Sequence, residues 1–178
     1  MSSTNRGKDR HLYDYYKTPY WCVSELYRCI TLPEPTLDPC AGDGGLMLAW
    51  PRMRGIELNP ALVRRAPDHI DIIHGDGLEA SWLGHNVLMN PPYGKAEAWI
   101  EKGCREAYSM VALLRLGYLS SKKRQAFWQA NPPSAVVILS KRPSFTADGK
   151  SDSADYCWIY WGKQACQGVQ VAWISPAS

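Results

Sequence analysis

Short apolar runs alternate with segments of helical periodicity along most of the chain. Seven runs are typical of strands and lie at residues 36–37, 54–57, 70–74, 86–89, 109–114, 135–139 and 156–161. Apolar side chains at helical spacing predict helices over 20–30, 96–108 and 120–130, with shorter helical pieces over 46–50 and from residue 61. Strands that alternate with helices favour an α/β fold with a mostly parallel sheet and helices on both faces.

The two ends of the chain differ in what the sequence predicts. Residues 1–14 are polar and are expected to form a flexible arm, whereas 15–178 has the length and apolar content of a single domain. At the start of the first helix, Thr18 is expected to be the cap and Pro19 to occupy the first turn.

Each of the first four predicted strands is followed by a polar residue. Asp38, Glu57, Asp76 and Asn90 occupy these positions. The carboxyl ends of parallel strands meet at one edge of a sheet, which is where open α/β sheets bind ligands. The simpler explanation is that these polar residues only contact solvent. The motifs around them have to distinguish this explanation from a ligand site.

The segment after Asp38 is rich in glycine. Glycines let a backbone pass close to a ligand, but residues 42–45 lack both the dinucleotide-binding spacing and the Gly-Lys-Ser/Thr of a phosphate loop. Glu57 at a strand end can bind both hydroxyls of a ribose. Asp76, followed by Gly77, could accept a hydrogen bond from an adenine amino group. The expected ligand is therefore an adenosine that carries something other than a pyrophosphate.

Residues 90–93 read Asn-Pro-Pro-Tyr and form the most specific motif of the chain. Neither Pro91 nor Pro92 has an N–H, so the carbonyls here are available as acceptors. The Asn90 oxygen and a proline carbonyl can together accept hydrogen bonds from both N–H groups of one exocyclic amine. These bonds free the lone pair of the nitrogen for attack on a methyl group. Tyr93 offers a flat face for a base. A plain turn after a strand is the alternative.

The composition is 46% hydrophobic and 21% charged, as expected for a packed soluble domain. No apolar run approaches the length of a membrane span and no secretory signal is visible, so we expect a cytoplasmic location. Seven basic residues but only Asp148 as an acid occur between 115 and 150. This segment suits a polyanionic partner or, equally well, a solvated helix face.

Taken together, these motifs resemble the S-adenosylmethionine-dependent amino-methyltransferases of DNA, most closely the small phage and prophage members that modify adenine N6. The resemblance implies a class I methyltransferase-like Rossmann fold with a seven-stranded, mostly parallel sheet and a late antiparallel strand. It also implies S-adenosyl-L-methionine as cofactor, DNA (with RNA as a possibility) as partner, and no metal. No separate large target-recognition domain is expected.

The resemblance also assigns site residues. The cofactor site would comprise Thr18, Pro19, Asp38, Pro39, Ala41, Gly42, Gly44, Glu57, Asp76, Gly77 and Asn90. The catalytic motif would be Asn90, Pro91, Pro92 and Tyr93. Cys40 is interpreted as a packing residue, because amine methylation needs no covalent intermediate.

The substrate side is predicted from the basic segment. Phe145 could stack on a flipped-out base opposite Tyr93, or could pack its loop onto the core. Further candidates for contacts with the nucleic acid are Arg142 and Lys150 of that loop, and Lys122, Lys123 and Arg124 of the basic helix. Solvated surface is the alternative for all of them.

Three other functions stay open. An RNA adenine and a protein glutamine amide would both suit Asn-Pro-Pro-Tyr, and a catalytically inactive binding subunit is the third. The recognition sequence and the oligomeric state are not predicted.

Overall fold

The computed structural model describes residues 16–50, 52–120, 122–145, 151–162 and 170–176. The expected N-terminal arm and Lys150 lie outside these ranges. Eight strands form one sheet: β1 (Thr36–Asp38), β2 (Met53–Glu57), β3 (Ile72–His74), β4 (Asn86–Met89), β5 (Ser109–Arg115), β6 (Ala135–Leu139), β7 (Tyr156–Gly162) and β8 (Gln170–Ile174). The helices are α1 (Tyr20–Cys29), α2 (Pro60–Val63), α3 (Ala96–Glu106) and α4 (Gln125–Ala130), with short 3-10 turns at Tyr93–Lys95, Leu116–Tyr118 and Lys122–Arg124.

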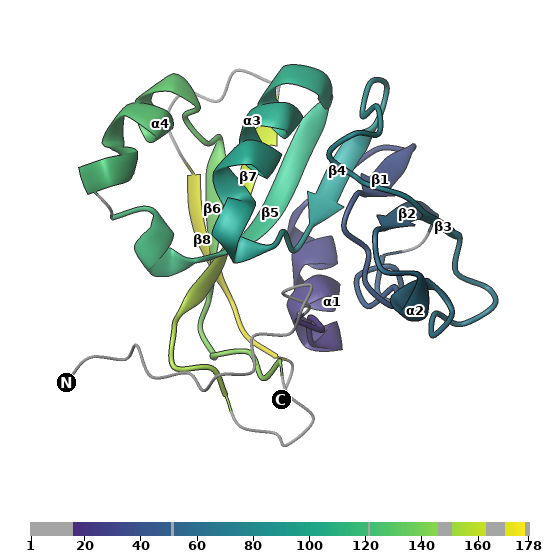
Figure 1. The fold of residues 1–178 in the computed structure, drawn as a ribbon. Coiled ribbons are helices and arrows are strands. Elements are labelled where there is room, and N and C mark those ends of the chain that lie inside the picture. The colour runs from purple at the N-terminus through teal and green to yellow at the C-terminus, as the bar shows by residue number, and fades with distance from the viewer. Residues whose placement is uncertain (1–15, 51, 121, 146–150, 163–169, 177–178) are drawn as a thin grey trace.

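The strand order is β3-β2-β1-β4-β5-β7-β6-β8 (Figure 1). Strands β1 to β5 are mutually parallel, and β7 runs antiparallel to both β5 and β6. The predicted α/β class with a late antiparallel strand is confirmed. The sheet has eight strands rather than seven, because β8 adds to the outer edge of β6 in parallel.

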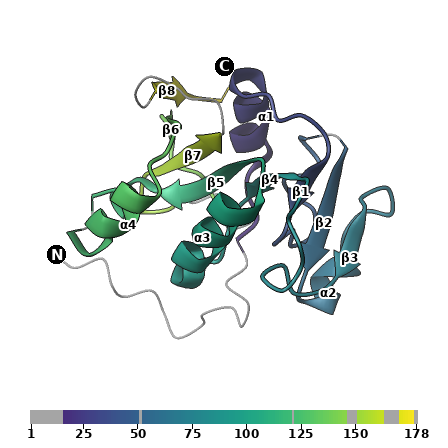
Figure 2. The ribbon, with the colours of Figure 1, turned by 90° about the horizontal axis from the view of Figure 1, so that it is seen from above.

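Both faces of the central strands are buried. Along β5, Val111 and Leu113 pack in one apolar cluster with α1, while Met110, Ala112 and Leu114 pack in a second cluster with α3. Successive side chains of a strand point to opposite faces, so a near-continuous apolar run is what a strand buried on two sides requires. Figure 2 shows α1 on one face of the sheet and α3 and α4 on the other.

Two local predictions are wrong. Residues 46–50 form hydrogen-bonded turns rather than a helix, with the Trp50 amide donating to the Leu46 carbonyl at 3.0 Å. In the sequence the segment lies between a glycine pair and Pro51, and both disfavour a helix. Thr18 does not cap α1: Pro19 takes the cap position without a side-chain bond, and the Thr18 hydroxyl accepts from Asn90 instead.

Several element boundaries also differ. The predicted strand over 70–74 begins at Ile72, and of the predicted basic helix over 120–130 only Gln125–Ala130 is α-helical. In the described part of the chain, none of the helices combines the length and the apolar character that crossing a membrane requires.

Candidate cofactor and substrate site

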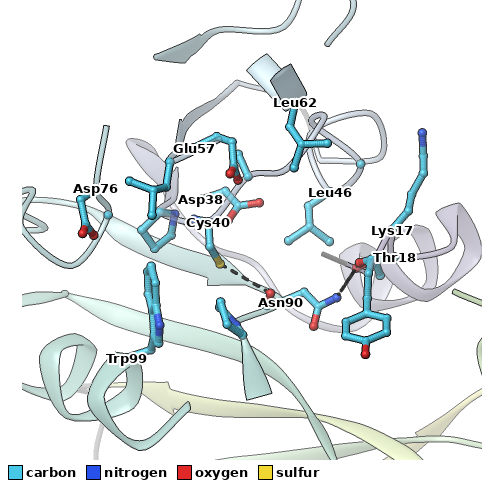
Figure 3. A pocket seen from close by; sticks show the side chains of 17 residues that line it. Lys17, Thr18, Asp38, Cys40, Leu46, Glu57, Leu62, Asp76, Asn90 and Trp99 are labelled. Atoms are coloured by element: carbon cyan, nitrogen blue, oxygen red, sulfur yellow. Dashed lines mark hydrogen bonds between the residues drawn. The ribbon is translucent and has the colours of Figure 1, made fainter. Parts of the chain in front are cut away.

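The four polar residues that follow the strands lie at one edge of the sheet. Asp38 and Glu57 are the last residues of β1 and β2, Asp76 follows β3 and Asn90 follows β4. Because these strands are parallel, their carboxyl ends meet, and all four residues line one pocket (Figure 3). The remaining lining residues are Tyr16, Lys17, Thr18, Pro39, Cys40, Ala41, Gly45, Leu46, Leu58, Leu62, Gly77, Pro92 and Trp99.

The two ends of the pocket are lined by different side chains. In Figure 3, Asp76 and Trp99 lie at one end, and Lys17 and Thr18 lie at the other. Leu58 is 52% exposed although it is apolar and lines the wall. An apolar side chain left open inside a pocket suits the flat face of a ligand such as a nucleobase.

Asp38 is a buried carboxyl group, only 1% exposed. Its Oδ1 accepts a hydrogen bond from the Cys40 amide at 3.1 Å, and among the described residues it has no ion-pair partner. Loss of solvation on burial raises its pKa to about 7. A positively charged ligand in the pocket would supply the missing counter-charge and favour the ionised form.

Glu57 ties the glycine-rich loop to the second strand. Its Oε2 accepts from the Gly42 amide at 2.8 Å and its Oε1 accepts from the Asn59 amide at 2.7 Å. Gly42 has a φ of +59°, in the left-handed region that favours glycine. The carboxylate is thereby fixed in the pocket wall, and each oxygen keeps a lone pair with which it can accept from a ligand hydroxyl.

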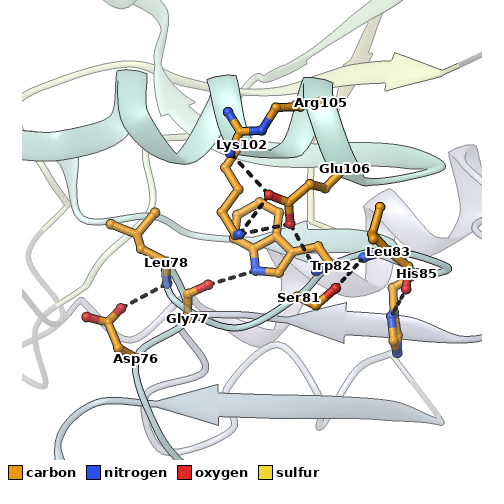
Figure 4. A network of polar contacts seen from close by, with 10 residues as sticks. All are labelled: Asp76, Gly77, Leu78, Ser81, Trp82, Leu83, His85, Lys102, Arg105 and Glu106. Carbon is orange, nitrogen blue, oxygen red and sulfur yellow. Dashed lines mark hydrogen bonds and ion pairs between the residues drawn. The ribbon is translucent and has the colours of Figure 1, made fainter.

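The loop after β3 is held in place from behind (Figure 4). The Trp82 indole donates to the Gly77 carbonyl at 2.8 Å, and Trp82 stacks on Trp99 with ring centroids 5.9 Å apart. Glu106 accepts from the Trp82 amide at 3.2 Å and is ion-paired with Lys102 at 2.8 Å. This network supports the Asp76 end of the pocket.

Asn90 has a defined amide orientation. Its Nδ2 donates to the Tyr16 carbonyl at 3.1 Å and to the Thr18 hydroxyl at 3.0 Å. A backbone carbonyl can only accept, so the amide nitrogen has to face Tyr16. The amide oxygen is thereby turned the other way, where it accepts from the Tyr93 hydroxyl at 2.8 Å.

Tyr93 lies in a group of aromatic side chains. Its ring centroid is 5.8 Å from that of Tyr16 and 5.9 Å from that of Tyr156, and the Arg115 guanidinium lies 5.4 Å from it. Burial raises the pKa of Tyr93 well above its usual value, so the hydroxyl stays protonated and remains a donor. Phe145 is half-buried and packs edge-on against Tyr156 and Tyr16, at 5.0 and 6.0 Å.

Cys40 is a protonated thiol in the pocket wall. Burial, followed by the charges of Asp38 and Glu57, raises its pKa well above the usual value. Its Sγ donates to the Asn90 carbonyl at 3.5 Å. A thiol in this state is no nucleophile, which agrees with the interpretation of Cys40 as a packing residue.

Not all predicted cofactor and catalytic residues line the pocket. Those that do not are Pro19, Gly42, Gly44, Pro91 and Tyr93. Gly44 has a φ of +84° and lies against Ile70, so it shapes the loop from behind. The residues missed from the sequence are Tyr16, Lys17, Gly45, Leu46, Leu58, Leu62 and Trp99.

The predicted substrate contacts are partly neutralised by acids. Arg124 is ion-paired with Glu97 at 2.9 Å, and Arg142 with Asp155 at 2.7 Å. Lys122 and Lys123 are exposed. The excess of positive charge that the sequence suggests for 115–150 is therefore smaller in the folded chain.

Comparison with known proteins shows which solved structures share the fold of this chain. No family model matches the sequence, and no curated protein sequence matches it significantly. Solved structures do match. A Listeria monocytogenes protein assigned to the class I S-adenosylmethionine-dependent methyltransferases has a TM-score of 0.65 at 14% identity, over 97% of this chain and 68% of that one.

Two further matches are an RNA methyltransferase and a protein of a restriction enzyme. The 23S rRNA methyltransferase ErmE has a TM-score of 0.62 at 16% identity, over 86% of this chain and 73% of that one. The M protein of the type I restriction enzyme EcoKI has a TM-score of 0.60 at 14% identity, over 84% of this chain and 44% of that one. These matches show that the chain shares the fold of class I methyltransferase structures.

Proposed function

We propose that the protein transfers a methyl group from S-adenosylmethionine to the exocyclic N6 amine of adenine in DNA. The observation that carries the proposal is the orientation of Asn90, at the end of β4 and at the edge of the pocket. Tyr16 and Thr18 bind its amide nitrogen, so its oxygen is held as an acceptor.

The lining of the pocket offers a partner for each part of S-adenosylmethionine. Asp76 would accept from the adenine amine and Glu57 from the ribose hydroxyls, while Thr18 and Lys17 would lie at the amino-acid end. Asp38 supports this assignment independently, because it is a buried acid without a cationic partner in the described part of the chain.

When bound, the cofactor supplies an electrophilic methyl group beside a positively charged sulfur. The Asn90 oxygen and the Pro91 carbonyl would accept the two N–H groups of the target amine. These bonds favour a tetrahedral nitrogen with its lone pair directed at the methyl group, and the nitrogen releases one proton once methylated. The described residues place no donor on the Pro91 carbonyl, so it can accept from the substrate.

The Asn90 oxygen is already bonded to the Tyr93 hydroxyl. An amide oxygen has two lone pairs, so it can accept from the amine in addition. Catalysis would rest on positioning and polar acceptors rather than on a strong base.

Replacing Asn90 tests this directly. We expect Asn90→Ala to lower methyl transfer at least a hundredfold while the affinity for S-adenosylhomocysteine, measured by calorimetry, stays within about threefold. Transfer at the wild-type rate by Asn90→Ala would exclude the proposed mechanism. RNA is the second substrate to assay, because the fold matches an rRNA methyltransferase as well as a restriction-system M protein.

A further inference from the structure

A second depression borders Tyr93, whose hydroxyl donates to Asn90 of the cofactor pocket. We call it the Tyr93 groove; it is lined by Tyr93, Arg115, Tyr118, Ser120, Arg124 and Asp155, among others. Within the described residues it shares no lining residue with the cofactor pocket. Tyr93 therefore forms the boundary between the catalytic motif and this groove.

Two arginines of the groove lie over tyrosine rings. The Arg115 guanidinium lies 5.4 Å from the Tyr93 centroid, and that of Arg124 lies 3.8 Å from the Tyr118 centroid. Each is also fixed through its Nε, Arg115 on the Tyr156 hydroxyl at 3.2 Å and Arg124 on Glu97 at 2.9 Å. The edge that carries the two Nη groups is the side of each guanidinium left to approach a ligand.

The charge of the groove argues against a site for phosphate alone. Arg124 is balanced by Glu97, and Asp155 is ion-paired with Arg142 at 2.7 Å. Behind Tyr93, Arg115 bonds the Tyr156 hydroxyl, which donates to Asp152 at 3.1 Å. Aromatic rings and planar donors in a balanced electrostatic environment suit a nucleobase better than an isolated anion.

We propose that the Tyr93 groove binds the nucleobase adjacent to the target adenine in the same strand, and that it selects guanine. The inference rests on the proposed function, because the target amine has to lie at Asn90, to which the Tyr93 hydroxyl donates. Arginine only donates, so the base has to offer two neighbouring acceptors. Guanine does so with O6 and N7, and cytosine with O2 and N3; of the two, guanine has the larger ring system to lie against the tyrosines. The groove would then recognise the neighbour of the target adenine.

The experiment measures binding rather than turnover. Fluorescein-labelled thymidine oligonucleotides carry one adenine and a neighbour, on the 5′ or 3′ side, that is guanine, 7-deazaguanine, cytosine or thymine. Anisotropy in the presence of S-adenosylhomocysteine gives their affinities for the full chain. We expect guanine on one side to bind about tenfold more tightly than cytosine or thymine, and 7-deazaguanine to lose most of that advantage because it lacks the N7 acceptor.

Variants assign the preference to the groove. Arg115→Lys and Arg124→Lys keep the charge but lose the planar fork, and we expect at least one of them to reduce the guanine advantage below about threefold. Arg28→Lys, on the exposed surface of α1 and paired with Glu25, is the matched control and should retain it. If a variant fails to fold, the comparison of guanine with 7-deazaguanine in the wild type still tests the contact.

Other outcomes separate this inference from the proposed function. Wild-type protein that binds all neighbours equally, or a guanine advantage that survives in both variants, would overturn the inference, even if adenine is methylated. A guanine preference that depends on these arginines, without methyl transfer to adenine, would sustain the groove and overturn the proposed function.

Discussion

The carboxyl group of Asp38 would couple cofactor binding to pH. Burial raises its pKa to about 7, so the empty protein holds a proton there at pH 6. A cationic cofactor favours the ionised form, and binding below pH 7 therefore releases that proton. We expect the affinity for S-adenosylmethionine to rise by up to about tenfold between pH 6 and pH 8.

Calorimetry in buffers of different ionisation enthalpy would measure the released proton. Asp38→Asn cannot ionise and should bind weakly with little pH dependence. The same raised pKa has a consequence for the free protein: the native state binds more protons than the unfolded chain between about pH 4 and 7, so the contribution of Asp38 to stability is lost as the pH rises through that range. Wild-type affinity that does not change with pH would contradict this role.

Thr18 is a positioning residue for Asn90 in this account. Thr18→Val keeps the shape of the side chain but removes one of the two acceptors of the Asn90 amide nitrogen. We expect kcat to fall about five- to tenfold even at saturating cofactor, and Thr18→Ser to restore kcat. A raised cofactor Kd with an unchanged kcat would instead make Thr18 a cofactor contact only.

Some residues of the site could be predicted from the sequence, and others could not. Asp38, Glu57, Asp76 and Asn90 could be predicted because each follows a recognisable apolar strand. The Tyr16 carbonyl that fixes the Asn90 amide could not, because every residue has a carbonyl and only the folded chain brings this one within 3.1 Å.

At the scale of elements, the loop after β3 has to pass very close to the loop after β1. A Cβ at position 77 would overlap the Pro39 carbonyl oxygen, so Gly77 allows this approach. We expect Gly77→Ala to displace the Asp76 end of the pocket, to lower cofactor affinity at least tenfold and to lower Tm. Calorimetry and thermal unfolding would measure both effects.

Gly94→Ala, in the 3-10 turn after β4, is the matched control. A Cβ at position 94 meets nothing within 4 Å, so this substitution should leave cofactor affinity within about twofold and Tm nearly unchanged. Equal effects of the two substitutions would mean that the contact between Gly77 and Pro39 does not hold the pocket open.

Elements could be predicted where burial leaves a clear pattern. All four residues of β4 are buried, and so are the five central residues of β5, which gives each strand a continuous apolar run. In β8, by contrast, four of the five residues are exposed. Its pairing with β6 defines this strand, and backbone pairing leaves little signal in a sequence. The helical prediction for 46–50 was wrong because a short apolar segment fits a turn as well.

For the molecule as a whole, the order of the motifs along the chain was the main basis for predicting the fold and the site. An acid, a glycine-rich loop, two further acids and Asn-Pro-Pro-Tyr follow successive strands, and parallel pairing brings their ends together. The partner is less determined by the sequence. The basic residues of 115–150 indicate a polyanion, but folding pairs Arg124 and Arg142 with acids from outside that segment.

Tritiated methyl transfer from S-adenosylmethionine to duplex DNA, single-stranded DNA, RNA and total protein, assayed in parallel with the products digested and identified by mass, tests the proposed activity. We expect N6-methyladenine in DNA, and its loss with Asn90→Ala. Label confined to RNA or protein would contradict the proposed substrate. Label on none of them, despite cofactor binding, would contradict the proposed activity.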